Sequence, residues 1–76
     1  MDNKRKKARQ WLEESTYEEF ENFIHKAKLT PRQIIIIKLK IVDNLLNYQV
    51  ASKLNVSIET VKNELSKIFD RVNKLV

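Results

Sequence analysis

The stretch Thr30–Val42, "TPRQIIIIKLKIV", decides the fold, because its two halves favour different secondary structures. Four consecutive isoleucines and the aliphatic residues after them are typical of a buried β-strand. The residues before them carry helix start signals: Thr30 suits an N-cap, Pro31 suits the first helical position, and Gln33 completes a capping box. The fold class therefore depends on whether this stretch forms a helix or a strand.

The local energies of the two conformations nearly cancel. The β-branched residues of this stretch cost about 2–3 kcal/mol in total within a helix. The cap, with a hydrophobic staple between Leu29 and Ile34, recovers about 1–2 kcal/mol. A strand here would find no evident partner strand elsewhere in the chain. We therefore predict a helix from Pro31 to about Asp43, buried on more than one side.

Composition narrows the fold and function classes. The 76 residues form one small domain and include no Cys and no Gly, so disulfides, thiolate metal sites, β-hairpins and phosphate-cradling loops are not expected. No apolar run reaches the length of a membrane span and no secretory signal is evident, so a cytoplasmic location is expected. Because so small a core is marginal by itself, a homodimer is a reasonable hypothesis.

The net charge of +5 is unevenly distributed along the chain. Residues 1–9 have a net charge of +4. Their five basic side chains are Lys4, Arg5, Lys6, Lys7 and Arg9, and the one acidic side chain is Asp2. Residues 10–29 hold two lysines and five glutamates, a net of −3, and residues 30–76 hold eight basic and four acidic side chains, a net of +4. Segregated positive charge favours a polyanionic partner, although a solvated basic tail fits the first segment equally well.

The helical signals predict an all-α domain over residues 10–76 behind a basic arm of residues 1–9. A first helix is expected from near Lys4 to Glu14. Ser15 and Thr16, each three residues before a glutamate, then offer two overlapping capping boxes for a second helix. The fold class is thus a small helical domain with one or two N-terminal helices and a C-terminal pair of helices.

That C-terminal pair is predicted as a short helix, Asn47–Leu54, and a longer one from Ile58 towards Leu75. Ser57 suits the N-cap of the longer helix. Its apolar stripe has spacings of four and three residues and consists of Val61, Leu65, Ile68, Val72 and Leu75. A short helix, a three-residue turn and a longer helix, over about residues 47–72, is helix-turn-helix spacing.

Single residues fit this motif. Ala51 is small where the two helices would cross, and Asn55 sits where the turn needs a positive φ, as Asn44 does at the preceding helix end. The face of the last helix opposite Val61 and Leu65 is polar or basic, able to reach base edges and phosphates, and carries Glu59, Thr60, Lys62, Asn63, Ser66 and Lys67. A polar helix face that is merely solvated remains the alternative.

The segments "LTPRQ", "VASKLNVS" and "TVKNEL" resemble the helix-turn-helix shared by the promoter-binding C-terminal domain of bacterial sigma factors and by LuxR-type regulators. The resemblance covers Leu29 to about Val72, and the interval from Thr30 to Ala51 fits the sigma-type pattern without a gap. Leu46 stands where the family often has a Ser or Thr cap. With no sigma core-binding domain before the motif and no LuxR-type helix after it, a small stand-alone regulator of a phage or mobile element is expected.

The resemblance also implies a role for single residues. Ile58 to Phe69 would be the recognition helix on double-stranded DNA, with Lys62, Asn63 and Ser66 in the major groove. The residues nearer the phosphates would be Arg32, Asn47, Tyr48, Thr60 and Lys67.

The leading hypothesis is a sequence-specific DNA-binding transcriptional regulator. A sigma-like module that binds RNA polymerase or another transcription protein, and a phage DNA-packaging component, are the alternatives. No enzyme activity, small-molecule substrate, metal or cofactor is expected, because the single histidine, His25, has no catalytic constellation around it. Trp11, Phe20 and Phe23 are assigned to the core, with a partner surface as the alternative for Trp11 and Phe20. The basic arm is either a flexible tail or a DNA contact.

Overall fold

The computed structural model describes residues 3–75, with side chains from residue 6 onward. Over these residues it is all-helical, as predicted, with five helices and no strand. They are α1 (Asn3–Glu14), α2 (Tyr17–Ala27), α3 (Pro31–Ile41), α4 (Asn47–Leu54) and α5 (Ile58–Leu75). The run of four isoleucines is therefore helical, and the bounds predicted for α4 and α5 are confirmed.

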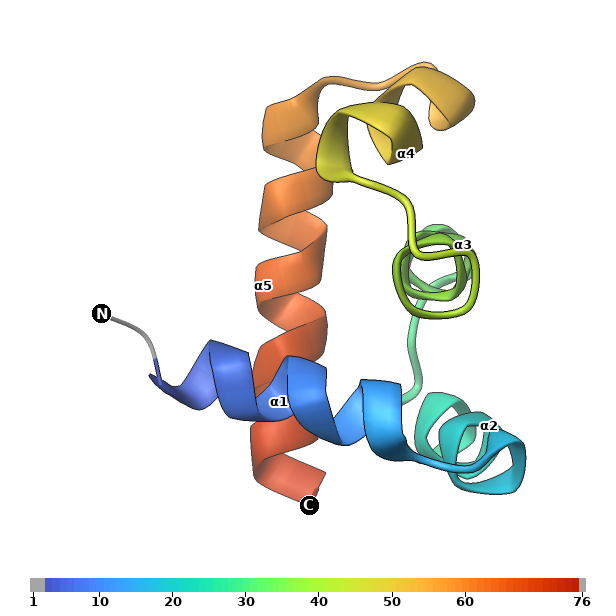
Figure 1. Cartoon of the computed structure of the whole chain (residues 1–76), viewed down its shortest axis with the longest axis vertical. Helices are drawn as coiled ribbons and strands as arrows, with labels where there is room; N and C mark the ends of the chain where they lie inside the picture. The colour runs from blue at the N-terminus through green and yellow to red at the C-terminus, as the bar shows by residue number, and fades with distance from the viewer. Residues whose placement is uncertain (1–2, 76) are drawn as a thin grey trace.

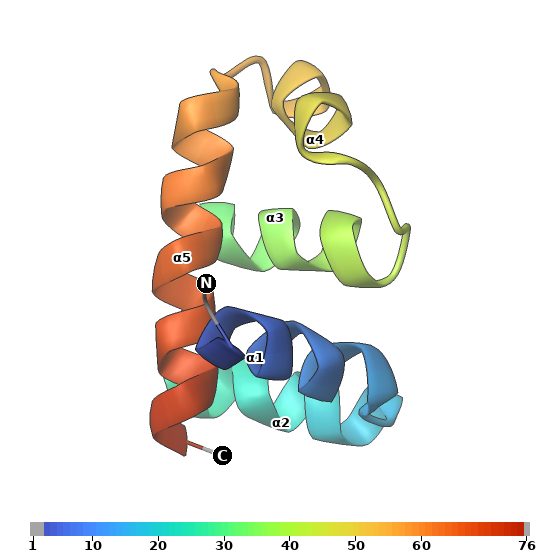
Figure 2. The same ribbon diagram turned by 60° about the vertical axis from the view of Figure 1, so that its left-hand side comes forward.

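Helix α5 is the axis of the fold (Figures 1 and 2). Each of the other four helices packs against it. Helix α4 lies at its N-terminal end, α3 beside its middle, and α1 and α2 beside its C-terminal half. The hydrophobic core therefore lies along one side of α5.

The core fills the space between α5 and its neighbours. Apolar side chains from all five helices contribute to it, and those that are fully buried include Leu12, Ile36, Ile37, Val50, Val61, Ile68 and Val72. Four of the five residues of the stripe predicted on α5 are buried. The fifth, Leu75, is about half exposed, because it is the last residue of the helix and α1 and α2 cover it incompletely.

The starts of α2 and α3 are set by side-chain caps that were predicted. At α3 the backbone N–H of Gln33 donates to Thr30 Oγ1 at 3.2 Å, and the N–H of Thr30 donates to Gln33 Oε1 at 3.1 Å. Of the two boxes offered before α2, Thr16 with Glu19 forms. The Ser15 hydroxyl instead donates to the carbonyl of Leu12 at 2.8 Å and so ends α1.

Helix ends are set by left-handed residues. Asn44 has φ 57° and Asn55 has φ 58°, as predicted from their tolerance of this region. Lys28, after α2, has φ 53° and was not predicted, because lysine carries a Cβ and no short polar group that eases this conformation. All three are residues at which the chain changes direction between helices.

Helix α3 departs from its prediction in length and in burial. It ends at Ile41, two residues before the expected Asp43, because the N–H of Leu45 returns to the carbonyl of Leu39 at 3.1 Å across the left-handed Asn44. Its burial is one-sided: Ile36 and Ile37 are in the core, whereas Ile35 is 47% exposed.

The buried side of α3 also includes a charged residue, Lys40, which is 8% exposed. Burial lowers the pKa of its amine, and the Arg9 guanidinium of α1 lowers it further, while Glu13 opposes them. Desolvation and repulsion by Arg9 thus both disfavour the charged form of Lys40.

The N-terminal segment is helical where it is described. Residues 3–9, predicted as part of a basic arm, belong to α1, and Ala8 is buried in the core. Phe20 and Phe23 are core residues, as predicted, and the Trp11 ring meets Phe23 edge-on at 5.9 Å between centroids. Trp11 itself is half-buried, and His25 is exposed.

Candidate nucleic-acid interface

The turn between α4 and α5 is held by backbone and hydroxyl bonds. The N–H of Val56 donates to the carbonyl of Ala51 at 3.0 Å across the left-handed Asn55. Ser57 Oγ then accepts the N–H of Thr60 at 3.1 Å and caps α5. Ala51 and Val61 are both buried where the helices meet, so this turn fixes the direction in which α5 leaves α4.

The N-terminal half of α5 has an uncovered side. In both ribbon views its side facing away from α3 and α4 carries no other helix (Figures 1 and 2). Residues four apart form ridges along a helix, and two polar ridges run along this side: Lys62 with Ser66, and Asn63 with Lys67. Lys62, Asn63 and Lys67 are exposed, and Ser66 is half-buried. This surface is polar, carries two cations and is open to a partner.

One border of the open side is a hollow of about 270 Å³ between α5 and the first residue of α4. Leu65 and Phe69 contribute apolar surface to it, and Lys62, Ser66 and Asn47 contribute polar groups. The side-chain oxygen of Asn47 is buried and accepts no hydrogen bond. The geometry thus brings together three of the predicted DNA contacts, one from α4 and two from α5.

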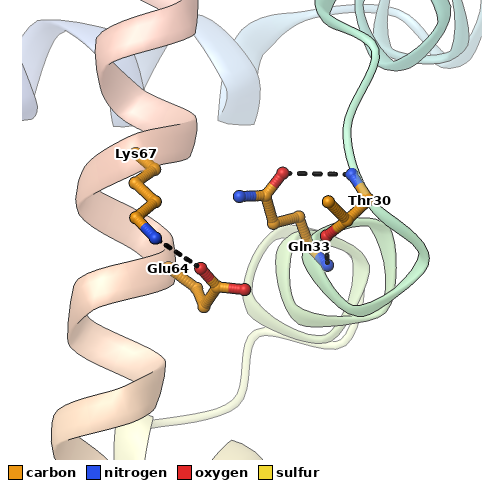
Figure 3. Close-up of polar contacts among 4 residues, drawn as sticks. All are labelled: Thr30, Gln33, Glu64 and Lys67. Carbon is orange, nitrogen blue, oxygen red and sulfur yellow. Dashed lines mark hydrogen bonds and ion pairs between the residues drawn. The ribbon is translucent and has the colours of Figure 1, made fainter.

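The opposite border is an ion pair that sequence reasoning did not assign. Lys67 Nζ lies 3.6 Å from Glu64 Oε1, and the Glu64 side chain is only 14% exposed. Figure 3 shows Glu64 pointing from α5 towards the capped first turn of α3, where Thr30 and Gln33 bond to one another. A carboxylate near a helix N-terminus is favourable. The spacing of three residues between Glu64 and Lys67 was the sequence signal that could have suggested the pair.

The remaining predicted contacts lie in the first turns of α3, α4 and α5. Arg32 is exposed in the first turn of α3, and Tyr48 is exposed in the first turn of α4. Glu59 is exposed at the start of α5. Thr60 is half-buried, because its hydroxyl shares a hydrogen bond of 2.9 Å with Ser57 inside the cap. Thr60 therefore has a structural role in addition to the predicted contact.

The basic residues of α1 lie apart from this surface in the ribbon, on a helix beside the C-terminal half of α5 (Figure 2). Lys6, Lys7 and Arg9 are exposed, and Arg9 pairs with Glu13 at 3.3 Å. The side chains of Lys4 and Arg5 lie outside the described ones. The structure thus does not bring α1 together with the two borders described above.

Comparison of the chain with protein-family models, curated proteins and solved structures gave no match. Within the described residues no group of three or more His, Asp or Glu side chains is arranged to hold a metal ion. None of the helices in that part of the chain has the length and apolarity that crossing a membrane requires. The functional conclusion therefore depends on the geometry of α3, α4 and α5.

Proposed function

We propose that α4, the turn and α5 act as a helix-turn-helix, and that the protein is a sequence-specific double-stranded DNA-binding transcriptional regulator. Residues Ile58 to Phe69 of α5 are the recognition segment. The observation that carries this proposal is the uncovered polar side of α5 with hydrogen-bonding or charged groups on each flank. An α-helix fits the major groove of B-DNA, which is about 12 Å wide.

The two borders correspond to the two DNA strands that flank a groove. On one flank, Asn47 and Tyr48 are at the start of α4, where the N–H groups of a helix attract phosphate. On the other flank, Arg32 and Lys67 supply positive charge. Between them Lys62 and Asn63 reach towards base edges, Lys to guanine and Asn to adenine. Charged and hydrogen-bonding groups on both flanks would hold α5 in register while its exposed ridges read bases.

A second candidate is a sigma-like module that binds RNA polymerase or another transcription protein. It is favoured by two large side chains, Leu46 and Tyr48, that are more than half exposed beside the start of α4. Exposed apolar and aromatic groups of this kind are typical of protein interfaces. The two candidates differ in what α5 recognises.

Selection from a pool of random duplexes, followed by fluorescence anisotropy on selected and scrambled duplexes, separates the candidates. The proposal expects enrichment of one motif and a loss of at least about tenfold in its binding for Lys62→Ala, as expected for a base contact. Lys26→Ala, an equal change of charge on α2, is the matched control and should affect both duplexes little. Selection that enriches no motif, with equal weak binding to both duplexes, would contradict the proposal and favour the protein-binding module.

A further inference from the structure

A cavity of about 500 Å³ lies away from the proposed DNA interface. It forms where the end of α1, the start of α2 and the end of α3 meet, and no residue of α4 or α5 lines it. Leu12, Phe20 and Ile41 are its apolar lining. We call this cavity the α1–α3 groove. Its volume is in the range of small ligand and side-chain pockets.

Two large side chains at the α1–α3 groove have little cover from the rest of the fold. Tyr17 is 80% exposed and Val42 is 67% exposed, although both line the groove. A domain with few core residues gains stability by burying such groups, so their exposure next to a cavity indicates a surface that a partner covers.

The charges around the groove indicate the charge of the partner that it would bind. Three carboxylates line it, those of Glu13, Glu21 and Asp43, and two cations pair with them: Arg9 lies 3.3 Å from Glu13 and Lys38 lies 3.5 Å from Glu21. The Glu21 oxygen that forms the ion pair with Lys38 is buried and accepts no hydrogen bond. The groove is thus net negative in a chain whose net charge is +5, and an anionic partner such as DNA would be repelled.

We propose that the α1–α3 groove binds a basic peptide segment of a partner protein. An arginine or lysine of that segment lays its aliphatic stem on the apolar lining and brings its charged end to Glu21, as long basic side chains do on apolar surfaces. A neighbouring aliphatic or aromatic side chain of the segment covers Tyr17 and Val42. This function is additional to DNA binding and leaves α4 and α5 free.

The probe is a synthetic 12-residue amphipathic peptide of Arg, Leu and Ala, compared with the same peptide in which Glu replaces every Arg. Backbone amide shifts of the whole isotope-labelled protein report where each peptide binds. The basic peptide should bind saturably, with shifts confined to the residues around Tyr17, Glu21 and Val42. Glu21→Gln should weaken binding about tenfold, as loss of a desolvated charge contact does.

Glu18→Gln, the same change of charge on the exposed surface of α2 outside the groove, is the matched control and should leave binding unchanged. Val42→Ser should weaken binding without unfolding the protein, because Val42 is mostly exposed. Equal effects of Glu18→Gln and Glu21→Gln, equal binding of the acidic peptide, shifts on α5, or no saturable binding would each overturn the proposal.

Self-association is measured alongside, by sedimentation equilibrium with and without Tyr17→Ser. A dimer that this substitution dissociates would assign the groove to a second copy of the chain and overturn the basic-peptide proposal. Duplex binding of Glu21→Gln is the independent readout, and it should equal that of the unaltered protein. Failure of the groove proposal is therefore distinguishable from failure of the proposed DNA-binding function.

Discussion

Arg71 of α5 and Ala27, the last residue of α2, are joined by a hydrogen bond of 2.8 Å although they are 44 positions apart in the chain. The Arg71 guanidinium donates to a carbonyl at the helix end, one of the groups that a helix leaves without an internal partner. It also places a positive charge at the negative end of the α2 dipole. This single contact therefore satisfies the end of α2 and docks it on α5.

Arg71→Ala is expected to lower the free energy of unfolding by about 1–2 kcal/mol, because it removes a charged hydrogen bond and leaves the Ala27 carbonyl unpaired. Thermal denaturation followed by circular dichroism should show a fall in Tm of about 4–8 °C per kcal/mol for a domain of this size. Lys74→Ala, an exposed cation one turn further on, is the control. Equal small shifts for both variants would mean that the contact adds nothing.

Lys28→Gly is expected to stabilise the protein. Lys28 holds φ 53° after α2, and a left-handed residue with a Cβ costs about 1–2 kcal/mol that glycine does not incur. Part of this gain is lost because glycine is more flexible in the unfolded chain. Urea titration should therefore move the midpoint upwards at constant m-value. Asn55→Gly, at a residue that already tolerates this conformation, should give the smaller gain, and the reverse order would contradict the explanation.

Lys40→Met is expected to raise the free energy of unfolding, since methionine is an apolar side chain of similar length and places no buried charge near Arg9. Replacing a buried charge by an apolar side chain stabilises by about 1 kcal/mol or more. Lys53→Met, on the exposed surface of α4, is the comparison and should change Tm little.

The lowered pKa of Lys40 predicts that the free energy of unfolding depends on pH. Its pKa in the folded state is lowered from the ordinary 10.5, so the unfolded chain binds more protons at a pH between the two values. The stability of the unaltered protein should therefore rise with pH through this window, and Lys40→Met should remove that rise. Chemical denaturation of both proteins at several alkaline pH values measures the difference in slope.

Asn63 and Lys67, which are neighbours on one exposed ridge of α5, should respond differently to substitution. Asn63→Ala should cost about 1–3 kcal/mol of discrimination at one or two positions of the selected duplex, with little change in salt dependence. Lys67→Ala should weaken binding to every duplex and flatten the salt slope by about one.

Anisotropy titrations of both variants on selected and scrambled duplexes at several salt concentrations give this comparison. Glu64→Gln isolates the effect of the ion pair, since it releases Lys67 without removing its charge. If Asn63→Ala loses the same affinity for the selected and the scrambled duplex, Asn63 does not read bases.

Local signals predicted much of the fold. Thr30 and Gln33 cap α3 as expected, and their effect is sufficient to place four isoleucines in a helix once the core accepts two of them. Asn44 and Asn55 adopt the left-handed conformation for which their short polar side chains suit them. The caps and the left-handed turns depend on residues close together in the chain, so local sequence was enough to predict them.

Features that depend on distant contacts could not be predicted in this way. Nothing near Lys40 indicates that it will be buried, and nothing near Ile35 indicates that this isoleucine, unlike the next two, will be exposed. The bond from Arg71 to Ala27 crosses most of the chain. In the candidate site the periodicity of α5 predicted that Lys62, Asn63 and Lys67 are exposed, whereas the position of Glu64 beside α3 depends on the packing of the two helices.

The central position of α5 has a consequence for how the domain is made. Apart from α3 with α4, the chief contacts between helices run through α5, which is the last of the five to leave the ribosome. Until it emerges, the apolar faces of α1 to α4 have no common surface to pack on, and short isolated helices are marginal in water. The core and the surface proposed to read DNA should therefore form in one late step of synthesis, and a chain interrupted before α5 should neither fold nor compete for the binding site.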